Sequence, residues 1–461
     1  MRAEPQPAPY APDVPIQALA PWLADPVESA DFPSATLRFR NRRWDASVGL
    51  DSLDDEQWIR HFARFDPLPG NLPQPLALRY HGHQFRVYNP ELGDGRGFLF
   101  AQLRDGAGRL LDLGTKGSGQ TPWSRQGDGR LTLKGAVREI LATEMLEALG
   151  VNTSKTFSVI ETGEELFRQD EPSPARSAVM VRLSHGHIRI GTFQRLIYLD
   201  DREHMAELVN YCLDTFPGSA PRTTDEDPAA CLLNQVVERL AQLAAQWAVA
   251  GFVHGVLNTD NMNISGESFD YGPWRWLPKW DPAFTAAYFD HGGLYAFGRQ
   301  AEALHWNCGQ LAVALRLLTD AEPLIAALNR FGPLYQEALS RQFVWRLGLQ
   351  SRGFDADAAL LAAAERAMRD SGDSPDVFFH RHRFGRAAQG ELKDAVSKYQ
   401  PSGQDHEIWG ESSPPSLLID TVEAIWGDIA DRDDWTRLHE TVTAIRRLGE
   451  ALGPPPSPVS P

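Results

Sequence analysis

The chain has 461 residues, of which 42% are hydrophobic, and a formal net charge of −16. This length exceeds what one compact core needs, so we expect two or three subdomains. The acidic balance argues against a nucleic-acid-binding protein, and no run of about eighteen apolar residues predicts a membrane-spanning helix. The first thirty residues lack the segments of a secretory signal, and the three cysteines are far apart, so we expect a cytoplasmic protein.

The first two hundred residues divide into an arm and a β-rich region. Residues 1–70 are rich in proline, with scattered apolar anchors, which predicts an irregular arm packed on the core. Residues 71–200 form the β-rich region, in which segments 97–104 and 108–113 are typical of strands joined by a hairpin turn. Segments 156–160 and 177–183 are further predicted strands, and the apolar stripe and final glycine of residues 131–149 predict one helix between the two pairs.

Residues 201–452 change to a helical pattern. Amphipathic helices are predicted over residues 232–249, 300–318 and 355–370, with a polar surface loop at 217–227 and a disordered tail at 453–461. A β-rich segment followed by a helical one indicates an α+β protein with a protein-kinase-like two-lobe fold, in which 71–200 is the N-lobe and 201–452 the C-lobe.

A basic, glycine-rich segment lies in the first lobe. Between Arg79 and Arg138 there are ten Lys or Arg and five Asp or Glu, which indicates a small anionic ligand or chance clustering on a solvated face. The motif Leu92-Gly-Asp-Gly-Arg-Gly97 precedes a predicted strand, and its glycines and Arg96 suit a phosphate. Taken alone, this motif is a weak signal, and an ordinary tight turn into a hairpin is the favoured interpretation.

The next strand ends at Lys116, about twenty residues after the glycine-rich motif, which is where kinases place the lysine that holds ATP phosphates. Such a lysine needs a carboxylate on the following helix, and Glu139 is the candidate. Periodicity places Glu139 opposite the apolar stripe, so a solvated surface glutamate is the alternative. Arg182 lies in an apolar strand and needs an anionic partner, either a carboxylate or a phosphate.

The helical lobe contains His254-Gly-Val-Leu-Asn-Thr-Asp-Asn261 followed by Asp270-Tyr-Gly272. Kinase-like phosphotransferases carry His-Gly-Asp-x-x-x-x-Asn and then Asp-Phe-Gly, where the Asn and the later Asp hold magnesium. Asn261 and Asp270 take those two positions, and their oxygens suit a hard cation. Val256 stands where the catalytic aspartate is expected and cannot accept a proton, which leaves Asp260 as the nearest replacement.

Several ordered motifs together resemble the selenoprotein O (SelO) family across about residues 20–320. They are Gly82-His-Gln-Phe85, Asn89-Pro-Glu-Leu-Gly-Asp-Gly-Arg96, Ser124-Arg-Gln-Gly-Asp-Gly-Arg130, His254-Gly-Val-Leu-Asn-Thr-Asp-Asn-Met262 and Asp270-Tyr-Gly-Pro273. The resemblance implies a kinase-like fold that binds ATP in a flipped orientation. It implies transfer of AMP to Ser, Thr or Tyr hydroxyls of proteins, with release of pyrophosphate, and the enzyme itself is a further candidate acceptor.

The resemblance also assigns roles to individual residues. Glu139 would pair with Lys116, Asn261 and Asp270 would bind Mg²⁺ or alternatively Mn²⁺, and Asp260 would accept the proton. The residues that would contact the nucleotide are Gly93, Gly95, Arg96, Lys116, Asp128, Gly129, Arg182 and Arg189.

Two other functions remain open. A kinase-like phosphotransferase would use Asp260 in place of the missing aspartate, and Val256 argues against it. A nucleotide-binding pseudokinase scaffold has no need of a metal site, so the set of Lys116, Asn261 and Asp270 argues against that function.

Overall fold

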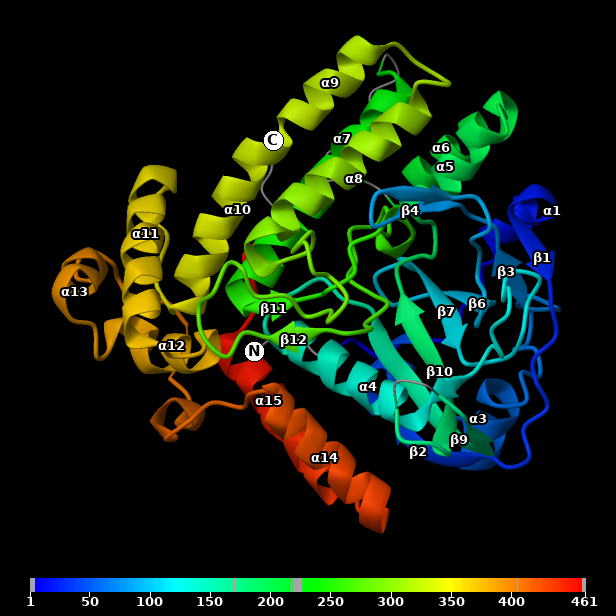
Figure 1. Ribbon diagram of the computed structural model, residues 1–461, viewed down its shortest axis with the longest axis horizontal. Helices are drawn as coiled ribbons and strands as arrows, with labels where there is room; N and C mark the ends of the chain where they lie inside the picture. Colours follow the sequence, from blue (N-terminus) through cyan, green and yellow to red (C-terminus); the bar gives the residue numbers. More distant parts are fainter. Residues whose placement is uncertain (1–4, 169–170, 217, 219–225, 404, 458–461) are drawn as a thin grey trace.

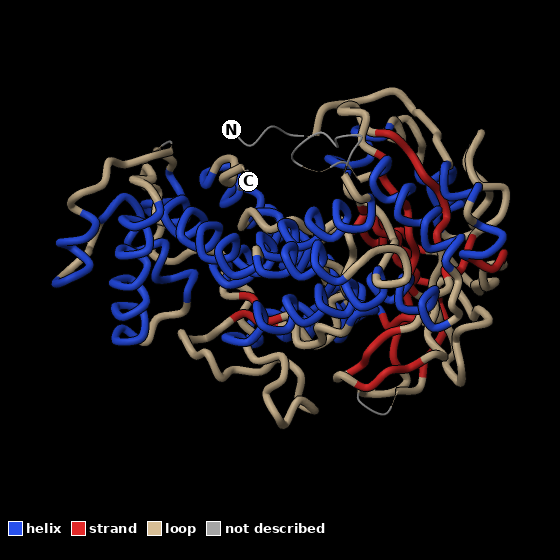
Figure 2. The backbone as a smooth tube through the Cα atoms, turned by 90° about the horizontal axis from the view of Figure 1, so that it is seen from above, coloured by secondary structure: helices blue, strands red, loops and turns tan. Residues whose placement is uncertain are grey.

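The computed structural model describes residues 5–168, 171–216, 218, 226–403 and 405–457. It is a mixed α and β structure with one large sheet and many helices. The strands gather at one end of the molecule and a group of long helices occupies the other (Figures 1 and 2). The α+β class is therefore confirmed.

The main sheet has eight strands, and every pairing between them is antiparallel. The order is β1-β3-β6-β7-β10-β9-β2, and β8 pairs with β10 beside this path. The bounds are β1 Ala24–Pro26, β2 Thr36–Arg40, β3 Leu76–Leu78, β6 Leu99–Arg104, β7 Leu110–Lys116, β8 Leu131–Thr132, β9 Lys155–Leu166 and β10 Ala175–Ser184.

The predicted hairpin joins β6 and β7. The amide of Gly108 donates to the carbonyl of Asp105 at 2.8 Å, and Arg104 pairs with Leu110 across the turn. Each predicted strand lies within or overlaps an observed one, and most of the residues of these strands are buried, so both faces of the sheet are covered.

The N-terminal segment contains more regular structure than its proline content predicted. Its strands β1 and β2 pair with β3 and β9, at the two ends of the strand order. Helix α3, Asp55–Phe62, covers one face of the sheet through two fully buried rings. The Trp58 indole lies 5.1 Å from the Phe157 ring and donates to the Ser158 hydroxyl at 2.9 Å. The segment thus contributes two strands to the sheet and a helix that covers one of its faces.

Helix α4, Leu133–Ala148, packs against β9 and β10 and also against α14, Ile419–Arg432, and α15, Thr436–Leu452. It begins after the Thr132 N-cap, whose side chain accepts from the amide of Gly135. Thirteen of its sixteen residues are buried, so it has no solvent-facing stripe of the usual width.

The helical end is built around α7, Pro228–Ala250, which begins at the Asp227 N-cap and ends at Gly251 in the left-handed conformation with φ +66°. Helices α8 and α10 pack on it. The other elements are α1 Ala20–Leu23, α2 Arg42–Asp45, α5 Ile190–Tyr198, α6 Arg202–Thr215, α8 Gln300–Leu315, α9 Ala321–Asn329, α10 Phe331–Arg346, α11 Phe354–Ser371, α12 Pro375–His382, α13 Gly390–Val396, and strands β4 Gly82–Gln84, β5 Val87–Asn89, β11 Phe252–Val253 and β12 Arg275–Trp276.

Two predictions concern segments near the described boundaries. The loop predicted at 217–227 lies outside the described residues except for positions 218, 226 and 227. The tail predicted to be disordered is described as far as residue 457, and Pro455 lies against Gly150, so this part contacts the core. Among the described helices, none combines the length and apolar character needed to cross a lipid bilayer.

Candidate active site

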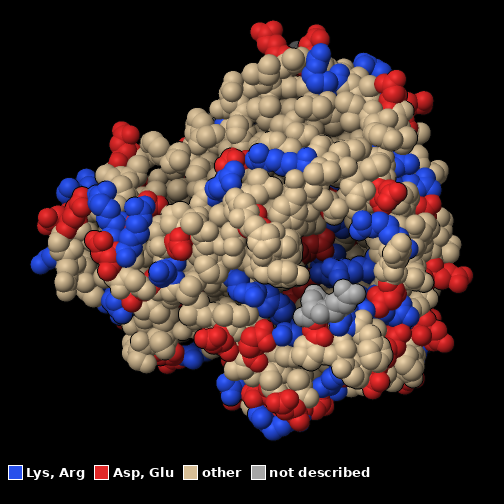
Figure 3. All heavy atoms as spheres, viewed as in Figure 1, with Lys and Arg blue, Asp and Glu red and all other residues tan. Residues whose placement is uncertain are grey.

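A cavity of about 720 Å³ lies between the sheet and the loops that follow α7. Figure 3 shows Lys and Arg side chains around a hollow in this face of the molecule. The glycine-rich loop, the loop at residues 123–130, strands β7 and β10, and residues 256–273 form its walls. All predicted site residues except Glu139 line it, namely Gly93, Gly95, Arg96, Lys116, Asp128, Gly129, Arg182, Arg189, Asp260, Asn261 and Asp270.

Lys116 is the last residue of β7, and its ammonium group forms a hydrogen-bonded ion pair with Glu139 on α4. Both side chains are buried. The surface position that periodicity gave Glu139 is therefore wrong, because α4 is covered on nearly every side. Burial lowers the pKa of Lys116, and the Glu139 carboxylate opposes this shift. The Lys116 ammonium is also 4.0 Å from the Asp270 carboxylate.

Asp270 is the most strongly bound carboxylate of the cavity. One oxygen accepts from Arg182 on β10 at 2.6 Å, and the other accepts from Arg189, just before α5, at 2.8 Å. Burial would raise the pKa of Asp270, but the charges of Arg182, Arg189 and Lys116 hold it well below its usual range. Asp270 has φ +59°, a left-handed conformation that few non-glycine residues adopt and that is enriched at functional sites.

Asp260 and Asn261 lie in a short 3₁₀ turn, Thr259–Asn261, that Arg189 also contacts. The Arg189 guanidinium donates to the Asp260 carbonyl at 2.7 Å. One Asp260 carboxylate oxygen is buried with no hydrogen-bond partner among the described residues, and the other lies 3.5 Å from the amide nitrogen of Gln84. Burial raises the pKa of Asp260 to about 6. Asp260 is therefore a buried carboxylate of the cavity wall whose acceptor capacity is only partly used.

The amide and carboxylate oxygens on this side of the cavity suit a hard divalent cation. The Asn261 amide nitrogen donates to the Val256 carbonyl at 3.1 Å, which turns the amide oxygen away from that bond. Asp270 and Asp260 add carboxylate oxygens in the same cavity. Among described residues, no group of three His, Cys, Asp or Glu side chains could bind a metal alone. Magnesium fits such a partial set because it usually binds one or two carboxylates together with substrate phosphates and water.

The glycine-rich loop packs tightly on Trp123. A Cβ atom at Gly93 would meet the Trp123 ring at 2.3 Å, and one at Gly95 would meet the Trp123 carbonyl at 2.7 Å. The indole of Trp123 in turn donates to Asp25 at 2.9 Å. These two glycines line the cavity, and the close approach of the 123–130 loop is a further reason for glycine at both positions.

Two residues that the sequence did not single out hold predicted ones in place. Asp94, buried inside the glycine-rich motif, accepts from Arg189 at 3.2 Å and from the amide of Leu78 at 3.1 Å. Arg168 donates to both oxygens of Asp128 at 2.8 and 3.1 Å. An aspartate between two closely spaced glycines was the available signal for Asp94, whereas Arg168 lies in a polar turn with no motif.

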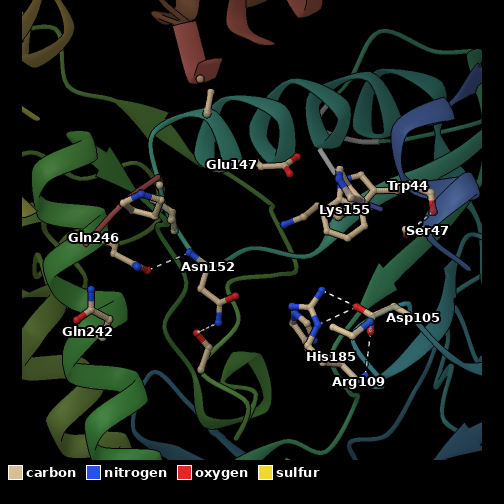
Figure 4. Close-up of a pocket in the computed structure, with 18 of the residues that line it drawn as sticks. Trp44, Ser47, Asp105, Arg109, Glu147, Asn152, Lys155, His185, Gln242 and Gln246 are labelled. Carbon is tan, nitrogen blue, oxygen red and sulfur yellow. Dashed lines mark hydrogen bonds and ion pairs between the residues drawn. The ribbon is translucent and has the colours of Figure 1, made fainter. Parts of the chain in front are cut away.

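A second cavity of about 870 Å³ contains none of the predicted site residues (Figure 4). It lies between α4, α7 and the β6–β7 turn, and several of its charged side chains pair with one another. Arg109 contacts Asp105 at 2.6 Å, Arg43 contacts Glu147 at 3.0 Å, and the amide of Asn152 donates to Gln246 at 2.9 Å. Because these charged and polar groups already have partners within the protein, the first cavity is the stronger candidate for the active site, although its volume is smaller.

The amino-acid sequence matches the family described as protein adenylyltransferase SelO over residues 10–411. The chain belongs to the SelO family. It is 48% identical to the protein nucleotidyltransferase YdiU of Synechocystis sp. over 465 residues, which is 94% of this chain and 97% of that protein. It is 49% identical to the Synechococcus elongatus protein of the same name over 359 residues, 77% of this chain and 70% of that protein.

A more distant relative carries the same name. The protein nucleotidyltransferase YdiU of Pseudomonas putida is 40% identical over 307 residues, 67% of this chain and 62% of that protein. The SelO match and these relatives identify the chain as an enzyme of the protein nucleotidyltransferase class.

Proposed function

We propose that this SelO-family enzyme transfers AMP from ATP to Ser, Thr or Tyr hydroxyls of proteins and releases pyrophosphate, with Mg²⁺ or Mn²⁺ as the metal. The observation that carries the proposal is the shared cavity: it gathers Lys116, Arg182 and Arg189 with the oxygens of Asn261 and Asp270. Cations suit a triphosphate, and amide and carboxylate oxygens suit its metal.

A kinase-like two-lobe arrangement is part of this proposal. It is supported by the lysine at the end of β7, its carboxylate partner on α4, and the two candidate metal ligands on loops beyond α7. A flipped orientation of ATP, implied by the family resemblance, stays a prediction.

The reaction requires an attacking hydroxyl oxygen to bond to the α-phosphorus while the bond from that phosphorus to the bridging oxygen of pyrophosphate breaks. The hydroxyl proton passes to the carboxylate of Asp260, whose Oδ2 makes only a 3.5 Å contact with Gln84. With a pKa of about 6, that carboxylate is mostly ionised at neutral pH and can accept a proton. Lys116 and the two arginines stabilise negative charge on the phosphates, which is the larger contribution.

The metal would be held by Asn261 and Asp270 and would supply charge neutralisation at the phosphates. For Asp270 to bind it, the carboxylate must use lone pairs other than those that accept from Arg182 and Arg189. Each carboxylate oxygen has two acceptor sites, so the arginine bonds and a metal bond are compatible. The arginines then also keep Asp270 ionised at low pH.

The experiment that tests the function uses ATP labelled at either the α- or the γ-phosphate, with Mg²⁺ and a protein extract as acceptor. We expect label from the α-phosphate on proteins and release of pyrophosphate, and we expect both to be lost in Asp270→Ala. Asp31→Ala is the matched control, because that aspartate is fully exposed, pairs with Arg64 and is not among the residues that line the cavity.

Each other outcome selects a different function. Transfer of γ-label alone would make the protein a phosphotransferase in spite of Val256. Binding of ATP without transfer of either label would support a nucleotide-binding scaffold.

A further inference from the structure

Two arginines lie side by side at the edge of the active-site cavity. Arg138 on α4 and Arg275 on β12 both donate to the carbonyl of Trp274, at 3.1 and 2.9 Å. Arg138 also lies over the Trp274 ring, 4.4 Å from its centroid, and Arg275 donates to the Pro273 carbonyl at 3.1 Å. Their guanidinium groups are therefore neighbours, held by the same short segment.

Neither guanidinium has an acidic partner within the described part of the chain, where no carboxylate oxygen lies within 4.0 Å of either group. The nearest acid charges belong to Glu423, which is paired with Lys134 at 2.7 Å, and Glu171, which accepts from Thr132 at 3.0 Å. Burial and then the charge of Arg275 lower the pKa of Arg138 to about 10.

This pair is costly for the free protein. A partly buried charge without a counter-charge is destabilising, and two adjacent like charges add to the cost. Carbonyl groups satisfy only some of the five donors of each guanidinium. The remaining N–H donors of the two planar guanidinium groups lie side by side, and this geometry suits a carboxylate or a phosphate.

The position of the pair indicates where the anion comes from. Arg138 donates to the carbonyl of Gly272 at 3.3 Å, and Gly272 and Pro273 line the cavity that contains Asp260 and Asp270. The phosphates of a nucleotide already have Arg96, Lys116, Arg182 and Arg189 inside that cavity. Outside it, the partner that must approach this edge is the protein that presents its hydroxyl group.

We propose that Arg138 and Arg275 form a docking site for an acidic side chain, Asp or Glu, of the acceptor protein near the modified hydroxyl. This inference rests on the proposed AMP transfer and adds a preference for acidic segments. Arg138 and Arg275 are positioning residues, since they hold the acceptor and do not touch the reacting atoms.

The test compares two matched sets of synthetic peptides. Each peptide carries one Ser, Thr or Tyr, and the flanking positions hold either Asp and Glu or the neutral Asn and Gln. The wild-type enzyme, the double variant Arg138→Gln/Arg275→Gln and the control Arg432→Gln are incubated with α-labelled ATP and Mg²⁺. Arg432 is an exposed arginine of α14 that pairs with Asp428, so the control removes a positive charge elsewhere.

The readout is the ratio of label in acidic peptides to label in neutral ones. We expect a ratio of about ten for the wild type, the size that one charge-assisted bidentate contact supports. The ratio should fall toward one in the double variant and remain about ten in the control. Equal labelling of both sets by the wild type, or an unchanged ratio in the double variant, would overturn the proposal.

Two further measurements distinguish acceptor docking from nucleotide binding and from a loss of catalysis. If the double variant raises the KM for ATP equally with both peptide sets, the pair binds nucleotide phosphate and the docking proposal is wrong. Fluorescence anisotropy of the acidic and neutral peptides with the nucleotide-free enzyme measures docking without catalysis. This binding measurement tests the docking site even if no peptide receives AMP. Absence of AMP transfer would count against the proposed function, not against the docking site. Arg275→Gln alone retains the Arg138 contact with Trp274 and serves if the double variant does not fold.

Discussion

Replacing Asp260 with asparagine should stabilise the free protein at neutral pH. Burial raises the pKa of this carboxyl from 3.8 to about 6, so the native state binds the proton more tightly than the unfolded chain does. Each pKa unit corresponds to about 1.4 kcal/mol, so the ionised Asp260 costs the native state about 3 kcal/mol at neutral pH. Asparagine has almost the same shape and no charge, and it removes this cost.

The sign of the effect fixes its pH dependence. A raised carboxyl pKa contributes stability at acidic pH, where both states are protonated, and that contribution is lost as pH rises from about 4 through about 6. The gain from Asp260→Asn should therefore be near zero at about pH 3 and reach its full size above about pH 7.

Urea unfolding of the metal-free protein, followed by circular dichroism at several pH values, measures this difference. Asp31→Asn is the control, because the Asp31 side chain is fully exposed and its replacement should give no comparable gain. A variant that is less stable than the wild type at neutral pH, or one whose gain is the same at every pH, would refute the burial argument. The same variant should lose AMP transfer by about a hundredfold if Asp260 is the proton acceptor.

Three other predictions follow from the cavity. Wild-type kcat/KM should rise with pH through about 6 as Asp260 ionises, and Asp260→Asn should show no such rise; a step retained in the variant would assign it to another group. Lys116→Met should destabilise the protein by about 3–5 kcal/mol because it leaves Glu139 buried and unpaired, and adding Glu139→Gln should recover much of that loss in urea unfolding. Gly93→Ala should weaken nucleotide binding about tenfold or more in calorimetry, since its Cβ would meet the Trp123 ring at 2.3 Å, and adding Trp123→Ala should relieve the clash; no recovery would indicate that Gly93 itself approaches the ligand.

Most of the site could be predicted because its residues lie in short, spaced motifs. The glycine-rich motif, Lys116 and the Asn261 and Asp270 motif come together in one cavity, although they are far apart in the sequence. The sequence predicted the Lys116–Glu139 pair and an anionic partner for Arg182, but it did not identify Asp270 as the partner of Arg182 and Arg189. Asp270 was expected only as a metal ligand, and the structure shows that it also binds Arg182 and Arg189. Such contacts depend on how β10 and the following loop cross the cavity, which no local pattern encodes.

Two expectations differ from the structure for simple physical reasons: the surface position that was the alternative for Glu139, and the irregular character of residues 1–70. Periodicity places a polar residue on a solvent-facing stripe only when a helix is covered on one side, and α4 is covered by strands and by two helices from the end of the chain, so Glu139 is buried. The proline content of residues 1–70 suggested an irregular arm, yet β1 and β2 occupy the ends of the sheet order, where proline is tolerated. Composition could not distinguish edge strands from an arm.

The last helix of the described chain is joined by an ion pair to the helix that carries Glu139. Arg446 of α15 donates to both oxygens of Glu144 on α4 at 2.6 and 2.8 Å, little more than one turn from Glu139. Arg446 thus holds α4 through Glu144, and Glu139 of the same helix pairs with Lys116. Removing α15 would break this ion pair, so we expect the shortened protein to hold Glu139, and with it Lys116, less firmly in place.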